Sequence, residues 1–276
     1  AARWQVRASR MRARILTAVA LAAVLIGVLL YGSAWATRAL LALFIAGGAW
    51  EWSAFLGAAT RARRAAYMLL VASLAIAAEL LLPGAREFSG LMLFGVCWWT
   101  LALLWLLFVP QCTPSWAAAL AGVCALVPTY VALIRMVSLW PHGAQWVLFI
   151  LTLVFAADTG AFFVGQACGR VRLAPRVSPR KTWEGVLGGM AMATVVGYAG
   201  SRWSGLETGV FVPLCLLGAA YSVVGDLTES MFKRGAGLKD SGRLFPGHGG
   251  ILDRVDGVLA ATPALYVGLV WLGVAS

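Results

Sequence analysis

Long apolar runs joined by short polar connections make up most of this chain. The runs last about 17–25 residues without the alternation of a strand, which is the length of a helix that crosses a bilayer. Backbone groups in hydrocarbon must be satisfied within their own segment, so these runs predict helices rather than barrel strands. We predict an all-α polytopic membrane protein with about nine transmembrane helices, over residues 15–32, 36–57, 65–83, 89–109, 115–139, 145–166, 184–200, 209–231 and 255–275.

Composition supports the same fold class. Of 276 residues, 61% are hydrophobic and 12% are charged, whereas soluble domains carry about 25% charged residues. A sizeable soluble domain is therefore excluded. The five cysteines show no C-x-x-C spacing, so the chain predicts neither a disulfide framework nor a zinc site.

The basic residues predict how the chain is oriented, because Lys and Arg accumulate in cytoplasmic connections. Four clusters, at residues 3–14, 61–64, 170–181 and 233–254, fall on one side of a nine-span topology. Only Arg38, Arg86, Arg135 and Arg202 fall on the other. We therefore place the N-terminus in the cytoplasm of a bacterial-type inner membrane and the C-terminus on the opposite side. The net charge of +11 follows this topology, so we expect membrane lipids and no nucleic acid as partners.

The first 36 residues also have the pattern of a signal peptide, with a basic start, an apolar run and "AWA". We interpret them as a retained first span, because removing it would move the Arg61–Arg64 connection to the outside.

Acidic residues concentrate in the second half of the chain. Only three precede residue 145 and eight follow it. We therefore divide the chain into scaffold and lipid-facing helices, residues 1–144, and a catalytic region, residues 145–276, with cytoplasmic loops at 167–183 and 232–254. The roles of Glu51 and Glu79 in the first region do not follow from the sequence.

Several carboxylates of the second half are expected at one depth, just below the cytoplasmic surface. Asp226 and Glu229 share a helix face, Asp253 and Asp256 repeat that spacing, and Asp158 lies on another span. Carboxylates inside a bilayer are costly and point to function. Hard oxygen donors suit Mg²⁺, which takes one or two protein carboxylates and leaves positions for water and phosphate.

Cations and glycines surround these acids. Lys and Arg suit phosphate groups, and the glycines of "PGHGG" at 246–250 permit close backbone approach to an anion. The pattern predicts a metal–phosphate site at the cytoplasmic interface. The alternative is a solvated basic loop with capping acids, which accounts poorly for Asp158 and Asp226. We also read Ser178-Pro179 as the start of a helix, with Glu184 capping it or orienting Lys181.

The segment "SMFKRGAGLKDSGRLFPGHGGILDRVD" (230–256) resembles the signature of phosphatidate cytidylyltransferases, also called CDP-diacylglycerol synthases. All fixed positions of that signature are present. "ADTGAFFVG" (157–165) and "SPRKTWEG" (178–185) are similar to two further motifs of the family, with Arg180 where lysine is commoner. The resemblance is strong over residues 145–276 and is only a hydrophobic pattern before them.

The resemblance implies transfer of a cytidylyl group from CTP to phosphatidate, giving CDP-diacylglycerol and pyrophosphate, with Mg²⁺ and room for a second monovalent or divalent cation. It also implies a homodimer. The expected catalytic residues are Asp226, Asp253, Lys233, Arg234 and Lys239. The expected substrate-binding residues are Lys181, Ser230, Asp240, His248, Gly249, Gly250 and Arg254. The expected metal ligands are Asp226 and Asp253 first, then Asp256 and Glu229, with Asp158 in support.

Three alternatives stay open at this point. The same cytidylyl group could go to a different lipid phosphate, because contacts to lipid tails are generic. A transporter of an anionic substrate would place its charges near the bilayer midplane at a repeat interface, and this chain shows neither feature. A CDP-alcohol phosphotransferase would need an arginine and further acids that "DGVLAA" (256–261) lacks.

Overall fold

The computed structural model describes residues 23–57, 60–82, 84–111, 113–242 and 250–275, and they are almost entirely helical. Residues 23–31 form a helix. The further elements are α2 (Ala34–Trp52), the short 3-10 helix η1 (Ser53–Leu56), α3 (Arg61–Leu81), α4 (Ala85–Phe108), α5 (Ser115–Leu139), α6 (Gly143–Cys168), β1 (Arg172–Ala174), β2 (Ser178–Thr182), α7 (Trp183–Ser204), α8 (Thr208–Gly235) and α9 (Leu252–Trp271).

Among the described residues, six helical segments are long and apolar enough to cross a membrane. They are Ala34–Leu56, Arg61–Leu81, Phe88–Phe108, Ser115–Leu139, Gly143–Cys168 and Thr208–Gly235. The prediction of a polytopic helical membrane protein is therefore confirmed. The number of nine spans and the sides of the two termini stay predictions, and most of the first expected span, 15–32, lies outside the described residues.

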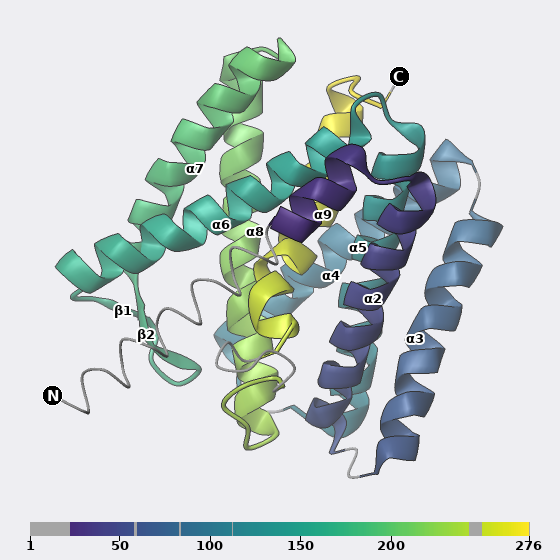
Figure 1. Ribbon diagram of the computed structural model, residues 1–276. Coiled ribbons are helices and arrows are strands. Elements are labelled where there is room, and N and C mark those ends of the chain that lie inside the picture. The colour runs from purple at the N-terminus through teal and green to yellow at the C-terminus, as the bar shows by residue number, and fades with distance from the viewer. Residues whose placement is uncertain (1–22, 58–59, 83, 112, 243–249, 276) are drawn as a thin grey trace, which may run out of the picture.

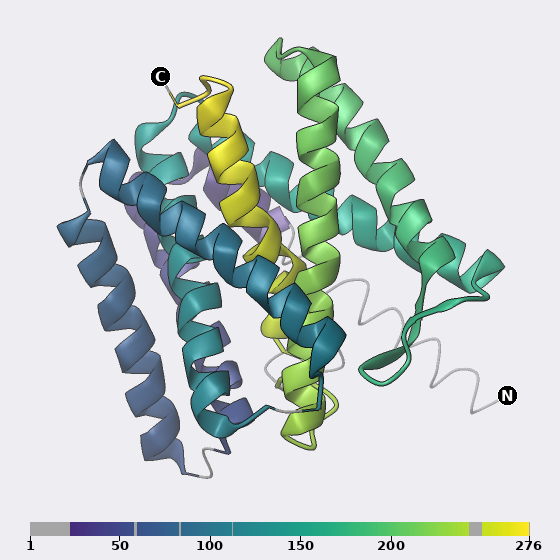
Figure 2. The ribbon, with the colours of Figure 1, turned by 180° about the vertical axis from the view of Figure 1, so that it is seen from behind.

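Helix α9 joins two groups of helices. In Figures 1 and 2, α2, α3 and α5 lie on one side of the molecule and α7 on the other, with α8 and α9 between them, while α4 and α6 run obliquely across the middle. α9 packs against α8, α4, α5 and α6. The two helices that carry most of the predicted site residues thus lie at the centre of the bundle.

Helices α6 and α7 are held together by backbone-to-backbone contact. A Cβ atom on Gly160 would come 2.6 Å from the carbonyl oxygen of Gly188, and one on Gly188 would come 2.7 Å from that of Gly160. Only glycine fits at both positions. Small residues allow such close approach between helices in membranes, and here they fix α7, with the hairpin before it, against α6.

The connection between α6 and α7 differs from the prediction. Ser178 and Pro179 do not start a helix, because they lie in β2, which pairs antiparallel with β1. The helix begins four residues later, where the Thr182 hydroxyl accepts a hydrogen bond of 3.1 Å from the Gly185 amide. Glu184 points to the hairpin backbone rather than to Lys181: its carboxylate accepts from the Val171 amide at 3.2 Å. The preference of Ser-Pro for a helix start is overridden because strand pairing satisfies the same backbone groups.

Three connections with basic residues lie, in their described parts, towards one end of the molecule. Figure 1 shows the hairpin, the C-terminal end of α8 and the start of α3 at the lower end, with the C-terminus at the upper end. Arg61, Arg172, Lys181 and Arg234 belong to these lower elements. This arrangement is the one that a shared cytoplasmic side requires.

Candidate active site

A polar cavity of about 650 Å³ opens between α6, α7, α8 and the hairpin. α6 contributes Asp158 and Gln166, the hairpin contributes Arg172 and Lys181, and α8 contributes Asp226. Ser178, Arg180, Thr182 and Ser222 complete its polar lining. The cavity therefore combines carboxylates from α6 and α8 with cations from the hairpin between α6 and α7.

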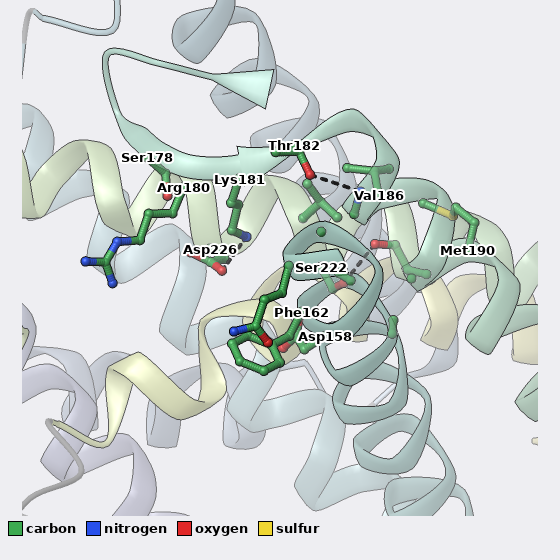
Figure 3. Close-up of a pocket in the computed structure, with 18 of the residues that line it drawn as sticks. Asp158, Phe162, Ser178, Arg180, Lys181, Thr182, Val186, Met190, Ser222 and Asp226 are labelled. Carbon is green, nitrogen blue, oxygen red and sulfur yellow. Dashed lines mark hydrogen bonds and ion pairs between the residues drawn. The ribbon is translucent and has the colours of Figure 1, made fainter. Parts of the chain in front are cut away.

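Lys181 and Asp226 form an ion pair in this cavity. Figure 3 shows the Lys181 side chain directed from β2 towards Asp226, with Asp158 and Phe162 of α6 nearby. The side chains of Lys181 and Asp226 are 26% and 29% exposed, so both are accessible to a ligand that enters. The Ser230 hydroxyl, one turn further along α8, donates to Asp226 Oδ1 at 3.4 Å.

Asp256 lies behind Asp226, at the contact between α8 and α9. It is 8% exposed, and its Oδ1 accepts from the Gly257 amide at 2.8 Å. A Cβ atom on Gly225 would collide with the Asp256 carbonyl oxygen, so glycine is required beside Asp226. Asp256 is within electrostatic range of Asp226, Glu229, Lys181 and Asp158. Three of the predicted metal ligands, Asp158, Asp226 and Asp256, thus lie within electrostatic range of one lysine, Lys181, and Asp226 pairs with it directly.

Lys233 forms a second, more buried network on the same helix. Its ammonium group donates to Glu229 Oε2 at 2.6 Å and to Asp253 Oδ1 at 2.7 Å. Lys233 and Glu229 are 7% and 1% exposed. Asp253 also accepts from the amides of Ser241 at 3.2 Å and Gly250 at 2.9 Å. Lys233, which was predicted to hold a phosphate, therefore binds two carboxylates. Asp253 binds residues on both sides of the signature loop, which we define as the segment between residues 242 and 250.

Glu51 contacts both sides of the signature segment, which the sequence did not reveal. It lies on α2, is 4% exposed, and its Oε2 accepts from the Ser241 hydroxyl at 3.2 Å and the Leu252 amide at 2.9 Å. Its Oε1 is buried without a hydrogen-bond partner in the described part of the chain. A Cβ atom on Gly242 or Gly250 would collide with the Glu51 carboxylate. Glu51 and Asp253 therefore each bind Ser241 before the signature loop and a backbone amide, of Leu252 or Gly250, after it. We call these two sets of contacts the clamps of the loop.

The remaining predicted residues are not gathered at these acids. Arg234, Lys239 and Asp240 are exposed, and the Arg234 guanidinium donates to the Leu238 carbonyl at 3.2 Å. Arg254 is exposed on α9 and lines a different, apolar cavity. His248 and Gly249 lie outside the described residues.

The oxygen donors fit a divalent cation of the Mg²⁺ type. No three His, Cys, Asp or Glu side chains in the described ranges are grouped closely enough to hold a metal by themselves. Mg²⁺ does not require such a group, because it takes one or two carboxylates and fills its octahedron with water and substrate phosphate. Glu229 Oε1 is a buried oxygen without a hydrogen-bond partner among the described residues. The donor set and the excess of carboxylate over lysine around Asp226 therefore suit Mg²⁺.

Comparison with known proteins gives the family. The model of the cytidylyltransferase family matches residues 12–272. A phosphatidate cytidylyltransferase of Pseudomonas aeruginosa is 40% identical over 95% of this chain and 97% of its own length. The corresponding protein of Haemophilus influenzae is 36% identical over 92% of this chain and 96% of its own length. One from Synechocystis is 44% identical over 48% of this chain and 46% of its own length.

The family model and the Pseudomonas and Haemophilus proteins cover the N-terminal helices as well as the signature region, so the resemblance is not confined to the residues that first suggested it. The family model includes Glu51 on α2, Lys181 on β2 and both acids at the start of α9. The chain belongs to the cytidylyltransferase family.

Proposed function

We propose that this protein transfers the cytidylyl group of CTP to phosphatidate, giving CDP-diacylglycerol and pyrophosphate. The observation that carries the proposal is the polar cavity, whose lining combines Lys181, Arg172 and Arg180 with Asp158 and Asp226. Membership of the cytidylyltransferase family and two full-length relatives named for this reaction support it. A cavity that holds both cations and carboxylates suits a polyanion that binds together with a metal ion.

The cations of the hairpin bind and orient the triphosphate. Lys181 can exchange Asp226 for a phosphate oxygen, because both side chains are partly exposed. Arg172 and Arg180 add guanidinium groups that match phosphate geometry. The ion pair with Asp226 keeps the Lys181 ammonium at the cavity before CTP arrives, so the positive charge is already in place when the triphosphate binds.

The reaction needs no strong general base. The lipid phosphate is already anionic near neutral pH, and one of its oxygens attacks the α-phosphorus of CTP. A new P–O bond forms, the bond to the β-phosphate oxygen breaks, and pyrophosphate leaves. Lys181 and the two arginines would stabilise the negative charge that develops on pyrophosphate. Because Lys181 would already have exchanged Asp226 for a phosphate oxygen, its ammonium group could stay with the departing pyrophosphate.

Asp226 is the first proposed ligand of Mg²⁺, with Asp158 and Asp256 beside it. When bound, the ion would neutralise phosphate charge and align the two substrates. Asp253 and Glu229 remain proposed ligands of second rank, because Lys233 and two backbone amides already engage Asp253. Room for a second monovalent or divalent cation lies with Glu229, whose Oε1 has no partner among the described residues.

The proposal includes where the protein works. CTP is soluble and phosphatidate is a lipid, so the site would face the cytoplasm at the inner-membrane surface, with the basic connections on that side. Residues 145–276 would carry the chemistry and residues 1–144 the scaffold, to which Glu51 adds a direct contact with the signature loop. A homodimer remains part of this proposal. Transfer to a different lipid phosphate is the alternative.

The test is pyrophosphate release by the detergent-purified protein supplied with CTP, phosphatidate and Mg²⁺. We expect turnover only when all three are present, and its loss in the Asp253→Asn variant. CDP-diacylglycerol should appear in equal amount when labelled CTP is followed into lipid. Turnover with another lipid phosphate but not with phosphatidate would select the alternative, and no turnover with any of them in folded protein would reject the proposal.

Replacing Glu51 by alanine should weaken turnover although Glu51 lies on α2. The change removes the acceptor of the Ser241 hydroxyl and the Leu252 amide, which costs about 1–3 kcal/mol for a buried donor left unpaired. The loop between residues 242 and 250 then loses one of its two clamps. We expect kcat/KM for CTP to fall about tenfold or more, since small misplacement of binding groups is costly.

Glu51→Gln is the conservative variant, because its carbonyl oxygen can still accept from the Leu252 amide. It should recover most of the kcat/KM that Glu51→Ala loses. Glu79→Ala, on α3, is the matched control with no expected change. An unaltered kcat/KM in folded Glu51→Ala protein would refute the clamp as a determinant of activity.

A further inference from the structure

A second cavity lies between α2, α5, α6 and α9, and its lining is apolar. It has a volume of about 300 Å³, and its walls include Leu41, Ile45, Leu133, Leu151, Phe155 and Val258. The polar residues of its lining are Thr129, Tyr130 and Arg254. The Thr129 hydroxyl lies 2.9 Å from the carbonyl oxygens of Ala125 and Leu259. One cation on α9 is therefore the main polar feature of an otherwise hydrocarbon-like space.

The first turns of α9 carry residues of this apolar cavity and also residues of the acidic cluster on α8. Asp253 and Asp256 share one helix face, where Asp253 pairs with Lys233 and Asp256 is buried. Arg254 and Val258, four residues apart, share the neighbouring face and line the apolar cavity. The same short stretch of helix thus offers carboxylates to α8 and a guanidinium to the apolar cavity.

Helix α6 connects the two cavities a second time. Leu151, Phe155, Asp158 and Phe162 follow one another at intervals of four, three and four residues, so they form one stripe. Leu151 and Phe155 line the apolar cavity, whereas Asp158 and Phe162 line the polar one. Phe155 and Asp158 are about 4.5 Å apart along the helix axis. The lining of the apolar cavity on α6 therefore lies within one helical turn of the lining of the polar cavity.

We propose that the apolar cavity holds one acyl chain of the lipid substrate, with the lipid phosphate beside Arg254 and directed towards the polar cavity. The proposal rests on the proposed function, because it assigns a binding place to the second substrate of that reaction. An apolar wall with a single guanidinium at one end complements an anionic amphiphile. A nucleotide, which is polar throughout, belongs instead in the cavity of Lys181 and Asp226.

Such a cavity would position the lipid substrate rather than increase its affinity for the protein. The chain leaves a bilayer that is as apolar as the leucines that receive it, so little hydrophobic free energy is gained. Holding the chain does fix where the phosphate lies relative to the α-phosphorus of CTP, and such orientation strongly affects rate. Blocking the cavity should therefore penalise lipids whose chain must enter it and spare lipids whose chains are too short to reach.

The experiment compares Leu133→Trp with Leu120→Trp, two substitutions on α5. Leu133 lines the cavity, whereas Leu120 is 57% exposed on the outer surface. Kinetics would be measured with dioleoyl phosphatidate and with dihexanoyl phosphatidate. For Leu133→Trp we expect kcat/KM to fall at least about tenfold with the long-chain lipid, with little change for the short-chain lipid or for the KM of CTP. Leu120→Trp should leave all three unchanged.

A measurement on the unaltered protein guards against a variant that does not fold. Phosphatidate with a photoreactive diazirine in the middle of one chain would be crosslinked and mapped by mass spectrometry. We expect labels on the cavity walls of α2, α5 and α6, and loss of those labels in Arg254→Gln.

The outcomes separate this inference from the proposed function. Turnover of phosphatidate with equal losses for long and short chains in Leu133→Trp would overturn the acyl-chain site and leave the function standing. Labels confined to outward-facing residues such as Leu120 would do the same. Absence of turnover by the unaltered protein would overturn both.

Discussion

Replacing Asp226 by asparagine is expected to lower kcat by about 10²–10³-fold, the size of effect known for removing one preorganised electrostatic group from an active site, such as a hydrogen-bond donor to a developing oxyanion. Asp226 pairs with Lys181, accepts from Ser230 and lies within electrostatic range of Asp256. Asparagine keeps the shape but loses the negative charge. Lys181 then has no counter-ion on α8, and the proposed Mg²⁺ site loses its first ligand.

The measurement is pyrophosphate release as a function of Mg²⁺ concentration. We expect the residual activity of Asp226→Asn to need more Mg²⁺ than the unaltered protein. Glu207→Gln is the matched control, because Glu207 is an exposed acid at the opposite end of the same helix. Full activity of Asp226→Asn at low Mg²⁺ would remove Asp226 from the metal site.

Replacing Lys233 by methionine should cause the largest loss of stability. The change leaves Glu229 and Asp253 facing each other without the ammonium group that both contact. Removing one partner of a buried ion pair destabilises a protein by about 3–5 kcal/mol, because the remaining charge is buried and uncompensated. Here two carboxylates remain, and Asp253 also holds the Ser241 and Gly250 amides.

Thermal unfolding in detergent would measure this loss, with monodispersity on size exclusion as the readout of folded protein. Lys239→Met serves as the stability control, because Lys239 is exposed six residues further along the chain. The double variant Lys233→Met/Glu229→Gln should recover part of the stability by removing one of the stranded charges. A Lys233→Met protein as stable as the unaltered one would show that the two acids do not depend on this lysine.

The helices could be predicted because apolar runs report them directly. The range 115–139 agrees with α5 at both ends, and the other described helices lie within a few residues of their predicted ranges. The hairpin could not be predicted in this way. Its strands are three and five residues long, and Ser178-Pro179 carries the local preference of a helix start. Pairing between the two strands is a longer-range interaction that no local pattern encodes.

The site residues show the same difference between local patterns, which can be predicted, and contacts between separate elements, which cannot. The spacing of Asp226 and Glu229 placed them on one helix face, because periodicity within a helix is local. The pairing of Lys181 with Asp226 depends on how β2 packs near α8, and no spacing in the chain expresses that. The role of Glu51 does not follow from the sequence, since a single carboxylate in an apolar run does not indicate its partner. The roles of the residues in catalysis stay predictions.

The contact between Glu51 and Leu252 spans 201 residues of chain, and it has a consequence for how the protein is made. At about 5–20 residues per second, ribosomes need on the order of 10–40 s to synthesise the residues between them. During that interval α2 has left the ribosome with a carboxylate whose partners do not yet exist. Insertion of the early helices must therefore keep that acid near water until α9 arrives, and the last helix completes the fold of the first ones as well as the site.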